Sequence, residues 1–364
     1  MAIILNSLHV DCYRGIKALE LDEFNHVNIL VGDNNAGKTS VMEMICALQA
    51  PLSLNVWNEI AKKKNDSYRG TMYYSAYRNI FPIDCDKRIA FTGDFCESDP
   101  LAVCMTAEEY STTISERELN RLNGLMRTGK QNEEDTYVDT TVLELCITAN
   151  SEELEFEVYD FQKRPPRRQI GEYRTMEVIN NTAFIEPRDG LENDFSYMKK
   201  AILDSEYHDQ LVEILREFDP AIMGILAVEE MGNTVYYVRT SEHTNAVPIS
   251  VYGDGLKKAL IIFAALASNK DGIVLIDEVE ASIHTSAMNK VFSTLISWAR
   301  RLNIQLFIST HSKEALNILL NCDSEYQEGI NVYTLYRNEQ KNYVRKLSCL
   351  GALDLQNRMG MEIR

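Results

Sequence analysis

The run from Gly32 to Thr39 carries the residue types and the spacing that a phosphate-binding loop requires. Every fixed position of the pattern GxxxxGK[ST] is matched by the sequence Gly32-Asp33-Asn34-Asn35-Ala36-Gly37-Lys38-Thr39. The two glycines allow backbone N–H groups to wrap closely around phosphate oxygens, Lys38 offers them a positive charge, and the Thr39 hydroxyl can bind Mg²⁺. The helix that follows presents Ser40 and its positive N-terminus to an anion. The run therefore predicts a site for a nucleotide and Mg²⁺ on these residues.

Two acidic residues end an apolar run further along the chain, Ile273-Val274-Leu275-Ile276-Asp277-Glu278. A buried parallel strand that ends in acids delivers them to the carboxyl edge of a sheet, where ligands of open α/β sheets bind. We expect Asp277 to hold Mg²⁺, directly or through water, and Glu278 to act as the general base that polarises the attacking water. The alternative is a strand followed by a solvated acidic turn, and the phosphate loop upstream weakens it.

A second apolar run, from Ile304 to Ser309, leads to His311. A neutral imidazole can donate a hydrogen bond and still respond to its surroundings, so His311 suits a sensor of the terminal phosphate. The alternative is a packed histidine before a helix that Ser312 caps.

A turn of small residues, from Ser250 to Gly255, opens an apolar helix. Small residues at a helix N-terminus make a second anion site, which we assign to Ser250, Gly253, Asp254 and Gly255. One nucleotide seldom needs two such turns from the same subunit, so this turn points to a nucleotide held by another subunit. The alternative is a plain capping turn.

The elements that must position these residues alternate between strand and helix. We expect buried strands at 26–31, 272–276 and 304–309, helices at 38–49, 256–268, 285–301 and 313–320, and a hairpin at 331–347. Between the two groups, the polar segment 105–136 is expected to be helical, with a loop at 129–135 and strands at 138–148 and 153–161. The alternation predicts an α/β fold with a parallel sheet, divided into residues 1–100, an inserted lobe at 101–244, and residues 245–364.

The composition restricts the class of protein. The chain has 364 residues, of which 45% are hydrophobic and 25% charged, which provides a core and excludes global disorder. No apolar run approaches the roughly 20 residues that cross a bilayer, and the eight cysteines lack CxxC spacing, so we expect a cytoplasmic protein with reduced thiols and no membrane partner. The net charge of −17 argues against a chain coated for DNA binding, although a local basic groove remains open.

Together these motifs resemble those of the ABC-type ATPases of the RecF, SMC and OLD group. The opening strand with Tyr13-Arg14-Gly15-Ile16-Lys17 is similar to the start common in that group. By this resemblance, residues 250–255 are the signature motif, Asp277-Glu278 is Walker B, His311 is the switch histidine, and Arg14 is a candidate adenine contact. No glutamine is placed at the group's Q-loop, because Gln49 lies too close to the phosphate-loop helix.

The resemblance implies a fold and an activity. The fold is a P-loop NTPase with an ABC-type head, in which helices cover both faces of a mixed sheet, plus an inserted α+β lobe. The activity is hydrolysis of ATP with Mg²⁺ by a head-to-tail dimer, with Lys38, Glu278 and His311 as catalytic residues. Higher oligomers are compatible with it.

The resemblance also suggests partners. No long heptad run lies between the motifs, and too few residues follow His311 for a Toprim nuclease domain. The chain therefore looks like a stand-alone OLD-like AAA ATPase of bacterial anti-phage defence. Such a protein would switch a separately encoded effector, such as a nuclease. Two alternatives stay open: a RecF-like repair ATPase that clamps DNA directly, and a scaffold that ATP stabilises with little turnover.

Overall fold

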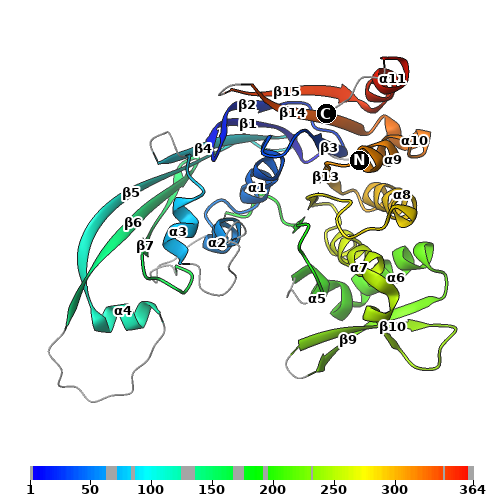
Figure 1. The fold of residues 1–364 in the computed structure, drawn as a ribbon, viewed down its shortest axis with the longest axis horizontal. Helices are drawn as coiled ribbons and strands as arrows, with labels where there is room; N and C mark the ends of the chain where they lie inside the picture. Colours follow the sequence, from blue (N-terminus) through cyan, green and yellow to red (C-terminus); the bar gives the residue numbers. More distant parts are fainter. Residues whose placement is uncertain are drawn as a thin grey trace.

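The computed structural model describes residues 3–62, 72–82, 87–123, 136–166, 176–191, 196–230, 233–338 and 341–359. Within these residues the strands form three sheets, and Figure 1 shows them spread along the molecule. No helix in the described segments has the length and apolar character needed to cross a membrane.

The central sheet has the strand order β15-β14-β3-β13-β12-β8. Its strands are β3 (Val27–Val31), β8 (Thr182–Ile185), β12 (Ile273–Ile276), β13 (Gln305–Ser309), β14 (Ile330–Asn338) and β15 (Lys341–Ser348). The strands from β14 to β8 are parallel, and β15 returns antiparallel to β14. The carboxyl ends of β3, β13, β12 and β8 therefore meet at one edge, as expected for the ligand edge of an α/β sheet.

Helices cover both faces of this sheet. The side chains of β12 alternate, so that Val274 and Ile276 join one core cluster while Ile273 and Leu275 join the other. The first cluster includes side chains of α5 (Ser196–Leu203), α6 (Ser205–Phe218), α7 (Gly253–Ser268), α8 (Thr285–Arg301) and α9 (Lys313–Leu320). The second includes α1 (Lys38–Leu48), whose apolar side chains are almost all buried. Burial on both faces explains why the strands read as continuous apolar runs.

A second, antiparallel sheet lies beyond α1 and has the order β2-β1-β4-β5-β6-β7. Its strands are β1 (Leu5–Tyr13), β2 (Ile16–Leu21), β4 (Arg88–Phe95), β5 (Leu101–Ser115), β6 (Tyr137–Ala149) and β7 (Glu152–Tyr159). Helices α2 (Leu54–Lys62) and α3 (Tyr73–Arg78) pack on it, and β5 and β6 extend as an arm toward α4 (Glu116–Leu122) (Figure 1).

A third sheet joins β9 (Ile222–Glu230), β10 (Asn233–Thr240) and β11 (Val247–Pro248). It leads through a short 3₁₀ turn, η1 (Ile249–Tyr252), into α7. At the other end of the chain, α10 (Ser324–Gln327) precedes β14 and α11 (Cys349–Met359) follows β15.

Two sequence expectations differ from this structure. Residues 105–115 were expected to be helical, yet they continue β5, because Met105, Thr106 and Ile114 belong to a stretch that pairs with β6 along its whole length. Among the described residues of this segment only α4 is helical, and the expected loop at 129–135 lies outside the described residues. The segment 101–244, expected as one lobe, is divided among all three sheets, because β8 is a strand of the central one.

Candidate nucleotide site

The phosphate loop connects β3 to α1, and its glycines have conformations that other residues resist. Gly32 has φ +142° and Gly37 has φ +103°. A Cβ atom on Gly32 would lie 2.1 Å from the carbonyl oxygen of Leu335, and one on Gly37 would lie 2.9 Å from Cδ1 of Ile16. The loop is therefore folded tightly against β14 and β2, which leaves no space for side chains at these positions.

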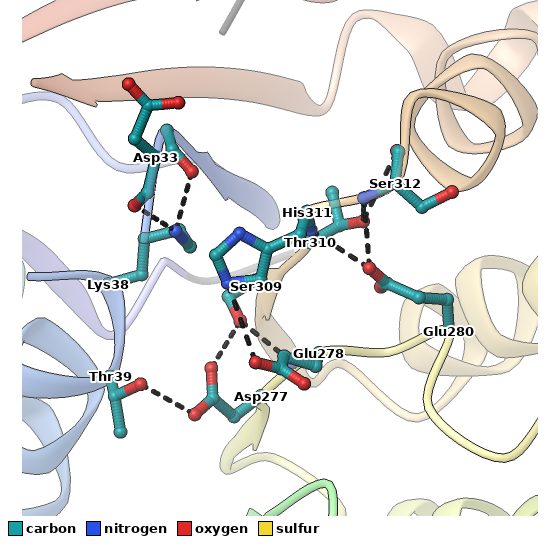
Figure 2. Close-up of polar contacts among 11 residues, drawn as sticks. Asp33, Lys38, Thr39, Asp277, Glu278, Glu280, Ser309, Thr310, His311 and Ser312 are labelled. Atoms are coloured by element: carbon teal, nitrogen blue, oxygen red, sulfur yellow. Dashed lines mark hydrogen bonds and ion pairs between the residues drawn. The ribbon is translucent and has the colours of Figure 1, made fainter. Parts of the chain in front are cut away.

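The amine of Lys38 points back into the loop. Its Nζ donates a hydrogen bond of 2.7 Å to the carbonyl oxygen of Gly32. It donates another of 2.9 Å to the carbonyl oxygen of Asp33 (Figure 2). Burial lowers the pKa of Lys38, although the negative charges of Asp277 and Glu278 act in the opposite direction. A positive charge so poorly solvated favours an anion beside it.

The two residues expected at Mg²⁺ are in direct contact. Thr39 Oγ1 donates a hydrogen bond of 2.8 Å to Oδ2 of Asp277, and Ser309 Oγ donates another to Oδ1. Asp277 is 5% exposed, and its N–H donates to the carbonyl of Ile185 at 2.8 Å. A hydroxyl and a carboxylate at the mouth of a phosphate loop are the hard oxygen donors that Mg²⁺ prefers, so these residues fit that ion.

The carboxylate of Glu278 faces the imidazole of His311. Its Oε1 lies 3.5 Å from Nε2 of His311, and both side chains are partly exposed. The N–H of Glu278 donates to Ser309 Oγ at 2.8 Å, so one serine orients both acids. Sequence reasoning missed this role of Ser309, and its only signal was a polar residue ending a buried strand.

Glu280 fixes the loop that carries His311. Its Oε1 accepts hydrogen bonds from the N–H of His311 (2.9 Å) and of Ser312 (3.0 Å) (Figure 2). Its Oε2 is buried and has no hydrogen-bond partner in the described part of the chain. Ser312 Oγ in turn accepts from the N–H of Ala315 at 3.1 Å and caps α9, so the capping interpretation holds for the residue beside His311.

The signature turn, residues 250–255, takes no part in these contacts among the described residues. It forms η1 and the first turn of α7, where Ser250 is exposed and Val251 is 71% exposed. A Cβ atom on Gly255 would meet open space. Among the described residues, no hydrogen bond or ion pair joins this turn to the phosphate loop, and the side chain of Asp254 is outside the described part. The hydrogen bonds and ion pair of the described residues therefore join the loop, the acids and His311, and none of them reaches the turn.

Arg14 does not have a free guanidinium. It forms an ion pair with Glu43 of α1, with Nε 3.0 Å from Oε2 and Nη2 3.1 Å from Oε1, and Tyr13 donates a hydrogen bond of 2.9 Å to the same carboxylate. Glu43 is 1% exposed. Arg14 thus joins the opening strands to the phosphate-loop helix, and the adenine contact suggested by the resemblance stays a prediction.

One further carboxylate lies at the same edge. Because Ile185 of β8 is level with Ile276 of β12, Glu186 follows its strand beside Asp277. The carbonyl of Glu186 accepts a hydrogen bond of 2.6 Å from Nζ of Lys258, a lysine of α7 that is 2% exposed and whose pKa is lowered by burial. Sequence reasoning missed both residues, because β8 is placed here by strand pairing far along the chain.

Comparisons with known proteins show what the chain is similar to. A family model described as "AAA ATPase domain" matches residues 3–186, and a second, an AAA domain described with a Type IV TA system, matches residues 150–317. An ATP/GTP phosphatase of Helicobacter pylori is 24% identical over 345 residues, which cover 87% of each chain. An uncharacterised protein of Methanocaldococcus jannaschii is 31% identical over 114 residues, which cover 31% of this chain and 98% of that protein. Among solved structures, an SMC head domain bound to a domain of ScpA, from Pyrococcus furiosus, has a TM-score of 0.47 at 10% identity and covers 98% of this chain and 100% of that one.

The AAA ATPase model spans the phosphate loop and extends to Glu186, which is half of the chain. The family that the motifs indicated is thereby confirmed. The chain belongs to the AAA ATPase domain family and is an ATPase.

Proposed function

We propose that this ATPase is a molecular switch that closes into a head-to-tail dimer around two Mg-ATP and opens on hydrolysis. The observation that carries the proposal is the division of the site. The phosphate loop, Asp277, Glu278 and His311 converge, while the signature turn is exposed at the N-terminus of α7 and, in the described residues, shares no hydrogen bond or ion pair with them. In a head-to-tail dimer, the turn of one subunit completes the site of the other.

Each residue then has a role in hydrolysis. Lys38 binds the β- and γ-phosphates, and Thr39 and Asp277 hold Mg²⁺, which supplies positive charge where negative charge develops on the phosphates. Glu278 accepts a proton from the attacking water, and His311 donates a hydrogen bond to the γ-phosphate. Ser250 and the N–H groups that begin α7 bind the γ-phosphate of the partner subunit's nucleotide.

The switch acts on a separately encoded effector, such as a nuclease of a defence system. The motif resemblance supports this role, and so does the family model described with a Type IV TA system. A second candidate is direct binding of DNA, which is supported by a stretch of 46 residues that is 44% identical to the DNA replication and repair protein RecF of Oenococcus oeni. The net charge of −17 opposes it.

The test is the mass of Glu278→Gln, measured by light scattering after size exclusion with and without Mg-ATP. We expect a shift from monomer to dimer, because this variant keeps the site's shape and cannot take the proton. The double variant Lys38→Ala/Glu278→Gln, which has no charge for the phosphates, should stay monomeric. An unchanged mass of Glu278→Gln in both conditions refutes the ATP-driven dimer, and steeply salt-dependent DNA binding by the ATPase alone supports the second candidate.

A further inference from the structure

Exposed large apolar side chains gather in a few places on the described surface. They lie on the β5–β6 arm (Tyr110, Tyr137, Val138), near the signature turn (Met223, Leu226, Val228, Val251), on the β14–β15 hairpin and the start of α11 (Tyr336, Tyr343, Leu350), and at the end of α5 (Leu203). Apolar surface gathered in this way indicates contact with another molecule more than scattered residues do. Two of these groups lie next to the two parts of the proposed dimer site, the phosphate loop and the signature turn.

The first adjoins the phosphate loop. Tyr336 and Tyr343 are directly opposite in β14 and β15, and their rings stack with centroids 5.4 Å apart at 14°. The side chains are 46% and 41% exposed. Thr334 of β14 pairs with Val31, the last residue of β3, and the Leu335 carbonyl adjoins Gly32. Tyr336 therefore lies just beyond the end of β3, beside the phosphate loop. It is a flat, rigid aromatic surface of the kind that is frequent in interface hot spots.

The second adjoins the signature turn, and we name Leu226, Val228 and Val251 the signature-side face. Leu226 and Val228 are 41% and 42% exposed on β9, whereas Ile225, which precedes them and points to the opposite face of the strand, is buried. Leu226 pairs with Tyr237, which pairs with Pro248 of β11, and β11 leads directly to Val251. The apolar surface therefore runs from the outer face of the third sheet to the turn itself.

The two surfaces cannot meet within one chain. Figure 1 shows the β14–β15 hairpin at the top of the molecule and β9 and β10 at the lower right, with the central sheet and its helices between them. A contact between them requires a second copy, and a twofold axis would form it twice. Their charges are complementary, since Lys341 and Arg345 lie on the same face of the hairpin as the tyrosine pair, while Glu230 lies on the same face of β9 as Leu226 and Val228.

We propose that the tyrosine pair of one subunit packs against the signature-side face of a second copy when the dimer closes on ATP. The inference rests on the proposed head-to-tail dimer and names the apolar contact that would hold it. In this dimer, ATP connects the two subunits at the polar centre of the interface. Each tyrosine pair adds an apolar contact at the edge of the interface. Closure would bury the apolar side chains that the single chain leaves exposed.

The first experiment measures dimer affinity in the Glu278→Gln background with saturating Mg-ATP. Adding Tyr336→Ala and Tyr343→Ala should raise the dimer dissociation constant by about tenfold or more, as truncation of interface anchors does. A matched control, Tyr110→Ala with Tyr137→Ala, removes two exposed tyrosines from the arm and should leave the constant unchanged. ATP binding to the monomer, followed by fluorescence titration, should be equal in all three proteins.

The outcomes separate the two proposals. If Glu278→Gln itself does not dimerise with ATP, the proposed function fails. If it dimerises and the hairpin variant dimerises equally well, only this inference fails. Loss of single-stranded DNA binding without loss of dimerisation in the hairpin variant would also overturn it, and would assign the stacked rings to bases.

A second experiment tests the contact directly. One preparation carries Val251→Cys and another carries Tyr343→Cys, both with Glu278→Gln, and a short bis-maleimide is added to each alone and to the mixture. We expect a crosslinked dimer in the mixture with Mg-ATP, above the background that native thiols such as the exposed Cys96 give in the separate preparations. No additional crosslink in a mixture that does dimerise would refute the inference.

Discussion

Replacing Glu280 with Gln removes one negative charge beneath the loop of His311 and keeps the shape of the side chain. In the structure, Oε1 accepts hydrogen bonds of 2.9 and 3.0 Å from the N–H groups of His311 and Ser312. A hydrogen bond to a charged group contributes about 1.5–3 kcal/mol and one to a neutral group about 0.5–1.5 kcal/mol, so a neutral acceptor loses roughly 1–1.5 kcal/mol on each bond. The charge also lies at the N-terminus of α9, where an anion contributes about 0.3–1 kcal/mol.

The loss weakens the position of His311 more than the binding of nucleotide, because the hydrogen bonds of Glu280 in the described residues go to the N–H groups of His311 and Ser312 and not to the phosphate loop. If about 1.4–2 kcal/mol of the total is felt in the transition state, kcat should fall by about 10–30-fold. Nucleotide affinity should change by less than about twofold. A larger effect on affinity than on kcat would contradict the assignment of Glu280 as a positioning residue.

The assay is phosphate release at saturating ATP, paired with a fluorescence titration of nucleotide binding. The matched control is Glu314→Gln, which removes an exposed acid from the first turn of the same helix and should leave kcat within about twofold. The double variant with His311→Ala should be no slower than His311→Ala alone, because Glu280 acts through that histidine. Wild-type kcat in Glu280→Gln, or losses that multiply in the double variant, would refute the reasoning.

Three further predictions follow from the geometry. Arg14→Ala should lower the free energy of unfolding by about 3–5 kcal/mol in urea, because it leaves the carboxylate of Glu43 buried without its cation; a loss below 1 kcal/mol would contradict this. Gly32→Ala should abolish nucleotide binding in a titration, since its Cβ would overlap the Leu335 carbonyl, and full affinity would show that the loop can move aside. Gly255→Ala should leave the free energy of unfolding in urea unchanged or slightly higher, because its Cβ atom would meet open space in the monomer. The same Cβ atom should weaken ATP-dependent dimerisation of Glu278→Gln, since in the proposed dimer this turn faces the partner's nucleotide. Unaltered dimerisation would show that this glycine does not lie in the interface.

The parts of the fold with strong local signals could be read from the sequence. Helices α8 and α9 begin and end where the apolar periodicity and Ser312 indicate, and β12 and β13 lie within one residue of their expected bounds. The arm could not be read this way. The Glu and Arg spacing of 105–136 suits a helix, but residues 105–115 are stabilised by pairing with β6, a partner beyond the reach of a local pattern.

The candidate site also combines residues that a local sequence pattern reveals with residues that it does not. The loop, Asp277, Glu278 and His311 belong to short motifs in which each residue type has a chemical reason, and the structure brings them together. Glu280 and Ser309 act on backbone N–H groups, which carry no sequence signal. Glu186 reaches the edge only because β8 pairs with β12, and no local pattern reports that pairing.

The position of β3 in the central sheet has a consequence for synthesis of the chain. Both neighbours of β3, β13 and β14, come from the last sixth of the sequence, about 270 residues or more after Val31. At roughly 5–20 residues per second, a ribosome needs about a quarter of a minute to a minute to supply them. Throughout that interval the strand before the phosphate loop has no partner on either side, so a nascent or prematurely terminated chain carries the full motif without the fold that shapes it. The complete nucleotide site can therefore form only after the last strands of the central sheet have been synthesised.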